Sequence, residues 1–308
     1  MKRTNSDLLA FVAVLLPAAI FCAAGWLALP APGRSVGSGL LAGLVLVVNG
    51  LLLYLISDRV MNEISLIAPV TYIVLAAANP AALSFTPLHA ASFLMAVSLL
   101  FFLLYSAIRP SLQYLAGAWA TLGCAALFFP PLAWLAPVYA VTTAPHAEEK
   151  GKYVVALLFS FILPAGAWIG IQYLRGAGMP GEVLRGLWDG MTTLQRPALH
   201  FSAATLCRIL LTVVATILAA LHVLRWLTHY RTAQYHAFLR LLVLTLALAL
   251  LGALFLSDSR QPLGLITLLP VTLLLSEYFR DRGGERRAWL LAVILMLVLI
   301  VERITCFL

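Results

Sequence analysis

The sequence predicts an all-α protein, a polytopic transmembrane helix bundle of about eleven spans that forms one integral-membrane domain, residues 1–308. Hydrophobic residues make up 63% of the chain and charged residues only 10%, against roughly 25% charged in soluble domains. The apolar residues form continuous runs, which favours helices over the alternating strands of a barrel. Most runs approach the roughly 20 residues that a helix needs to cross a bilayer.

Eleven apolar runs are predicted to be membrane spans. In chain order they are 8–29, 38–57, 64–78, 90–108, 113–129, 131–143, 154–174, 201–224, 237–256, 262–278 and 288–307. We interpret the first as an uncleaved anchor, because its apolar stretch exceeds the about 7–15 residues of a signal-peptide core. The longest connection, 175–200, is too short to fold as a separate domain. The charged break 146–152 suggests that the single domain consists of two halves, 1–145 and 146–308.

The span 131–143 is short and follows the Pro130-Pro131 turn, so the charges of the connections must decide whether it crosses. If it crosses, thirteen Lys and Arg, including Arg240 at the start of its span, lie on the same side of the membrane as the N-terminus. Five lie on the opposite side. Without the crossing the split becomes eight and ten. The positive-inside rule therefore predicts a crossing, a cytoplasmic N-terminus and a periplasmic C-terminus. The net charge of +8 suits anionic lipid, and no nucleic-acid partner is expected.

Several short motifs follow one another in a distinctive layout. They are Phe128-Phe129-Pro130-Pro131, the charged break 146–152, Leu157–Pro164 leading into Gly166, the basic connection with Tyr230, Arg231, Tyr235 and His236, and Leu275-Ser276-Glu277-Tyr278-Phe279 before a basic turn and a final helix. By this layout, most of the chain resembles an uncharacterised family of multipass inner-membrane proteins from Bacteroidota. The resemblance implies the inner membrane of a diderm bacterium and carries over no catalytic residue.

Polar residues inside the spans are costly to bury and are therefore candidates for function. They are Asn49, His89, Arg208, Glu302 and Arg303. No Asp or Glu lies near the middle of a span, which argues against an ion- or proton-coupled transporter. No His, Cys or acidic cluster has the spacing of a metal site, so neither a metal nor a cofactor is expected. The first outer loop, 30–37, lacks the acid that a glycosyltransferase would use there.

The largest outer loop, 175–200, contains an amphipathic segment at 181–193. Its apolar stripe at helical spacing consists of Val183, Leu184, Leu187, Trp188 and Met191. Pro180 and Glu182 are typical of a helix start. The pattern predicts a short interfacial helix on the outer leaflet, with Trp188 in the headgroup zone.

Cationic residues accompany this segment and suggest an anionic site. Arg175, Arg196 and His200 lie in the loop, and Arg208 lies about 10 Å below the outer boundary of the next span. Guanidinium groups bind phosphate oxygens bidentately, so we expect these residues and Glu302 to bind substrate, with His200 as the one catalytic candidate. A structural interpretation stays open, in which Arg175 and Arg196 contact lipid headgroups and Arg208 pairs with Glu302.

Three functions remain open, and the sequence leaves undecided whether the chain is an enzyme. The first is handling of an anionic polyprenyl-phosphate-linked glycan or lipid at the outer leaflet, as a polymerase, ligase or translocase would do. The second is a non-catalytic subunit or scaffold of a cell-envelope complex, with protein partners. Here the small-residue pairs Gly39/Gly43 and Gly166/Gly170 are expected to pack within the bundle. The third is facilitative transport of a small neutral solute. Membrane lipids and a lipid-linked phosphate are the expected ligands.

Overall fold

The computed structural model describes residues 36–60, 66–77, 79–107, 111–143, 150–176, 179–193, 203–226, 232–255 and 264–280. The predicted spans 8–29 and 288–307 lie outside these ranges, as do Arg196, His200 and Glu302. Within the described ranges each of the other nine predicted spans coincides with helix, and no strand occurs. The all-helical fold is therefore confirmed for this part of the chain.

The helices follow the predicted order. They are α2 (Val36–Val60), α3 (Ile67–Ala77), η1 (Pro80–Leu83), α4 (Pro87–Ala107), α5 (Leu112–Phe128), η2 (Pro130–Trp134), α6 (Leu135–Thr143), α7 (Lys150–Leu174), α8 (Pro180–Thr192), α9 (Ala203–Trp226), α10 (Thr232–Phe255) and α11 (Gly264–Arg280). Among the described helices, five are long and apolar enough to cross a membrane, namely α2, α4, α7, α9 and α10. Helices α3, α5 and α11 are apolar but shorter. The chain is thus a helical membrane protein.

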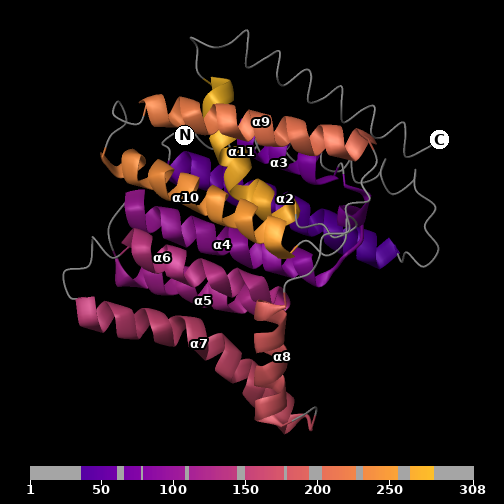
Figure 1. Ribbon diagram of the computed structural model, residues 1–308, viewed down its shortest axis with the longest axis vertical. Helices are drawn as coiled ribbons and strands as arrows, with labels where there is room; N and C mark the ends of the chain where they lie inside the picture. The colour runs from indigo at the N-terminus through magenta and orange to yellow at the C-terminus, as the bar shows by residue number, and fades with distance from the viewer. Residues whose placement is uncertain are drawn as a thin grey trace, which may run out of the picture.

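Most of the helices run side by side across Figure 1, and α8 stands crosswise to them beside the ends of α5 and α7. Helix α9 lies along the upper edge of the bundle and α7 along the lower edge, while α11 runs obliquely. Helix α4 packs against α2, α5, α10 and α11, and α11 also packs against α3 and α9. Within the described part of the chain, α7 packs mainly on α5 and α8, and α9 packs mainly on α11.

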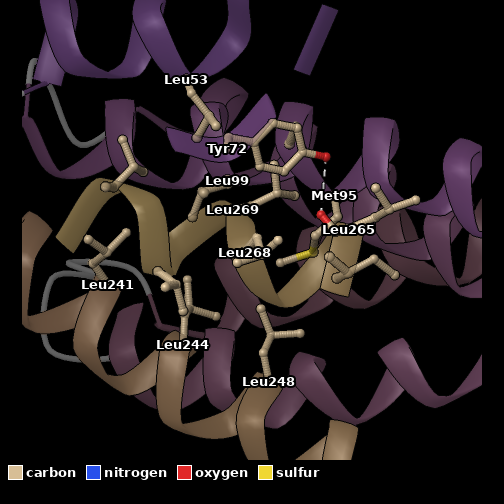
Figure 2. Packing of buried hydrophobic residues seen from close by; sticks show 14 of the residues in the cluster. Leu53, Tyr72, Met95, Leu99, Leu241, Leu244, Leu248, Leu265, Leu268 and Leu269 are labelled. Carbon is tan, nitrogen blue, oxygen red and sulfur yellow. Dashed lines mark hydrogen bonds between the residues drawn. The ribbon is translucent and has the colours of Figure 1, made fainter. Parts of the chain in front are cut away.

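The hydrophobic core is densest where α11 passes between α3 and α10. Figure 2 shows Leu265 and Leu269 of α11 near Tyr72 of α3, with Leu244 and Leu248 of α10 on the other side. All five side chains are almost completely buried. Since residues 268 to 277 of α11 are all buried, this helix is enclosed by protein nearly all round, as expected for a helix that is apolar on every face.

The doubtful span 131–143 is a continuous helical segment made of η2 and α6. Its 3₁₀ and α-helical rises add to a length of about 23 Å. Leu135 and Tyr139 are fully buried, and α6 and η2 both pack against α10. The turn before it forms because Pro130 and Pro131 cannot continue α5. The segment therefore packs on the bundle through the face that carries Leu135 and Tyr139, while Trp134 and Val141 are exposed.

Helices α5 and α7 approach each other closely at Gly123. A Cβ atom at this position would lie 2.5 Å from the backbone oxygen of Phe161, so only glycine fits without a shift. The edge of the Trp119 ring meets the Phe161 ring with centroids 6.1 Å apart. Gly166 and Gly170 behave differently, because a Cβ at either would meet nothing within 4 Å. The prediction that this pair packs within the bundle is wrong, since both residues lie on an exposed face of α7.

Candidate functional site

Arg208 lies on α9, the helix at the edge of the bundle. It is the sixth residue of this helix, about 8 Å along the axis from Ala203, and its side chain is half-buried. Its neighbours on α9 are mostly apolar, with Thr212 and Thr216 as the polar residues of the next two turns. The predicted depth of Arg208 below the outer boundary of the membrane stays a prediction.

Arg208 lines a cavity of about 470 Å³ between α9, α10 and α11, which we call the Arg208 groove. The described residues that line it are Leu75, Arg208, Ile209, Thr212, Val213, Thr216, Ile217, Ala220, Leu242, Thr245, Leu246, Ala249, Gly264, Thr267, Leu268, Val271 and Leu274. On each helix they recur every three or four residues, so one face of each helix forms a wall. Val213, Ile217 and Leu246 are exposed, so the groove opens on the side of the bundle.

The groove has one charged residue and four hydroxyl groups among its described lining residues. Each hydroxyl donates to a carbonyl of its own helix: Thr212 to Arg208 O at 2.8 Å, Thr216 to Thr212 O at 2.7 Å, Thr245 to Leu241 O at 2.7 Å and Thr267 to Gly264 O at 3.5 Å. A hydroxyl has one hydrogen to donate. The guanidinium of Arg208 is therefore the donor group that the groove offers to an anion.

The segment 181–193 is helical as predicted and forms α8, while its position at the membrane surface stays a prediction. Pro180 is its first residue, and the carboxylate of Glu182 accepts a hydrogen bond from the Met179 backbone N–H at 3.1 Å. None of its residues is buried. Its far end contacts η2, where the Trp134 Nε1–H donates to Met191 O at 3.0 Å. The helix is amphipathic and stands crosswise beside the ends of α5 and α7 (Figure 1).

The structure does not bring all the candidate residues together. Arg175 lies in the turn that ends α7, where Gly176 has a φ of 68°, and its side chain is exposed. Helices α7 and α9 lie on opposite edges of the bundle (Figure 1), so Arg175 is distant from Arg208. Arg196, His200 and Glu302 lie outside the described residues, and their role in the site stays a prediction.

Two buried charged residues escaped the sequence analysis. Arg240 was counted among the cytoplasmic helix ends, but it is the ninth residue of α10 and is only 3% exposed. Its guanidinium carbon lies 5.3 Å from the ring centroid of Phe102 and 5.1 Å from that of Tyr105, within the range of cation–π contacts. Glu277, near the end of α11, is 5% exposed. In the sequence, a charged residue within an apolar helix would have been the signal that Arg240 and Glu277 are buried.

The polar candidates Asn49 and His89 connect helices to one another. The Asn49 amide nitrogen donates to the Tyr72 hydroxyl at 2.9 Å and to Ser92 Oγ at 3.0 Å. Tyr72 donates to Leu265 O at 3.2 Å, shown in Figure 2. These bonds join α2, α3, α4 and α11.

His89 occupies the third position of α4 and caps its start. The Thr86 backbone N–H donates to His89 Nδ1 at 3.2 Å. The proton of the neutral ring is therefore on Nε2, which donates to Ala82 O at 2.9 Å. This is the role of the acid in a capping box, so His89 has a structural function here.

The fold and the Arg208 groove together define a helical membrane protein with a cationic, laterally open groove. Comparisons with protein-family models, with curated proteins and with solved structures find no match for the chain. Among the described residues, no three His, Cys, Asp or Glu side chains gather as a metal site would require. The function is therefore argued from the groove itself.

Proposed function

We propose that this is a multipass inner-membrane protein that handles an anionic polyprenyl-phosphate-linked glycan or lipid at the outer leaflet. The observation that carries the proposal is the Arg208 groove, in which one guanidinium lies at the end of apolar walls that open sideways. A lipid can enter such a groove sideways while its hydrocarbon chain stays within the bilayer. Its phosphate would meet a planar donor group suited to bidentate binding, in surroundings where the interaction is stronger than in water.

The amphipathic helix α8 supports an assignment of the site to one leaflet. Leu184 and Trp188 are 58% and 60% exposed, as expected for side chains that face lipid headgroups. The colours of Figure 1 put the start of α9 toward the same side of the bundle as α8, and Arg208 is the sixth residue of α9. The positive-inside rule makes this the outer side. The resemblance seen in the sequence favours the inner membrane, and Arg196 and His200 remain candidates for headgroup contacts.

The proposed topology requires η2 and α6 to cross the membrane. We expect reporters inserted at 108–110 and at 146–149 to lie on the same, cytoplasmic side, because α5 leads out and η2 with α6 leads back. Enzyme reporters that are active only in the periplasm measure this directly. Reporters found on opposite sides would exclude the crossing and with it the outer position of α8.

The lipid-binding proposal predicts a loss of binding in Arg208→Met. The purified protein should bind a twenty-carbon isoprenyl phosphate in detergent, and Arg208→Met should bind it at least tenfold more weakly while its thermal unfolding stays unchanged. The loss of a charge-assisted bidentate contact is worth about 1.5–3 kcal/mol, or roughly ten- to a hundredfold. The neutral isoprenol of equal length is the control for non-specific partition and should bind both proteins alike.

The competing interpretation is that Arg208 serves only to pair with Glu302. In that case Arg208→Met should destabilise the fold, and a second change, Glu302→Gln, should restore stability, because it removes the carboxylate left behind. Unchanged phosphate binding in Arg208→Met would contradict the proposal.

A second candidate function, a scaffold subunit of an envelope complex, is favoured by the exposed face of α7. Only Leu157 of its described side chains is buried. Gly166 and Gly170 lie on the face of α7 that points away from the bundle. Small residues spaced by four positions allow close approach of a partner helix. Under this alternative Arg208→Met would bind lipid phosphate like the wild type.

A further inference from the structure

We infer that the Arg208 groove takes a phosphate carried on a long hydrocarbon chain, with the phosphate at Arg208 and the chain running along α9 to Ala220. This inference rests on the proposed function and specifies the charge and the chain length of its ligand. Each of these two properties follows from a different feature of the groove.

The charge of the ligand follows from the donors. Arg208 is the one charged residue among the described lining residues, and the four threonine hydroxyls already donate within their own helices. A guanidinium matches the oxygens of one phosphate or carboxylate as a fork. A polar sugar would meet apolar walls along the groove, so a glycan must lie outside it.

The length of the chain follows from the extent of the walls. From Arg208 to Ala220 the groove follows α9 for twelve residues, about 18 Å at the helical rise. Because Arg208 already lies about 8 Å along α9, the far end is roughly 26 Å from the start of the helix. The hydrocarbon core is about 30 Å thick, so the chain passes the midplane and enters the opposite leaflet. A chain that fills the groove is therefore longer than half of the bilayer core.

The end of the groove that is far from Arg208 offers the decisive substitution. Ala220 of α9 lies there with Leu242 of α10 and Leu274 of α11. Phenylalanine at 220 would fill the space between them and shorten the groove without touching Arg208. Leu221→Phe is the matched control, because Leu221 is on the same helix, is 48% exposed and does not line the groove.

The experiment compares two phosphates, octyl phosphate and a twenty-carbon isoprenyl phosphate, on four purified proteins in detergent. We expect Ala220→Phe to bind the long phosphate at least tenfold more weakly and the short one unchanged, and Leu221→Phe to bind both like the wild type. Arg208→Met should weaken both. Inorganic phosphate should compete with neither, since it gains nothing from the apolar walls.

A second measurement does not depend on the variant. A long phosphate with a photoreactive group at the end of its chain should label wild-type residues around Ala220 and Leu242, and not residues near Arg208. Equal binding of the long phosphate by Ala220→Phe and the wild type, or labelling near Arg208, would overturn the inference and leave the proposed function intact. Unchanged binding of both phosphates by Arg208→Met would overturn the proposed function itself.

Discussion

Replacing Gly123 by alanine should separate α5 from α7 and lower the free energy of unfolding by about 3 kcal/mol, the upper part of the range for overpacked cores. The new methyl group would lie 2.5 Å from the backbone oxygen of Phe161, and a backbone atom cannot move aside as a flexible side chain can. Moving α7 outward would also loosen the contact between the Trp119 and Phe161 rings. Thermal unfolding in detergent, followed by circular dichroism, measures the loss.

The matched control for this prediction is Gly166→Ala on α7. A Cβ there meets nothing within 4 Å, and alanine is the better helix former by up to about 1 kcal/mol. We expect this variant to be as stable as the wild type or slightly more stable. Equal stability of Gly123→Ala and Gly166→Ala would show that α5 and α7 do not approach as closely as described.

Replacing Tyr139 by alanine should lower the free energy of unfolding by about 3–5 kcal/mol, as for other large buried aromatic residues. Tyr139 is fully buried. Its ring stacks on that of Phe102 at a centroid distance of 4.1 Å and meets the edge of Trp119 at 6.4 Å. The substitution therefore tests whether α6, the shortest of the α-helices described, is held inside the bundle. The change is measured by the same unfolding experiment.

Two further variants divide this effect into its parts. Ser98 donates its one hydrogen to Ala118 O at 2.7 Å, so the Tyr139 hydroxyl is the donor in their 3.0 Å hydrogen bond. Tyr139→Phe removes only this bond and should cost about 0.5–1.5 kcal/mol. Val141→Ala, on the exposed face of α6, should change little. A Tyr139→Ala protein as stable as Val141→Ala would exclude α6 from the core.

Helix positions were predictable because they depend on local composition. Apolar runs bounded by prolines, glycines and charges predicted nine of the described helical segments, and Pro180 with Glu182 predicted the start of α8. The boundaries differ by a few residues where polar side chains continue a helix. Thus α10 begins at Thr232 and not at 237, because polar residues are compatible with helix at the edge of a bilayer.

Candidate site residues were predictable only in part. Arg208 could be singled out from the sequence, because a cation within an apolar run is costly wherever the helix lies. Arg240 was missed because its distance from the helix end depends on where α10 begins, and its partners Phe102 and Tyr105 come from a distant segment. Arg175 was grouped with Arg208 by its loop, yet it lies on the opposite edge of the bundle (Figure 1).

Composition and periodicity by themselves determined that this chain is a helical membrane protein with an amphipathic helix among its spans, because burial in lipid requires continuous apolarity and internally satisfied backbone groups. Tertiary structure alone decided which faces meet. Gly123 has to be glycine because of Phe161, while Gly166, from the predicted packing pair Gly166/Gly170, faces outward. The Arg208 groove likewise exists only because α9 and α10 both pack on α11 and leave one face of each as a wall. Such pairings depend on side-chain shapes from segments far apart in the chain, which no local pattern records.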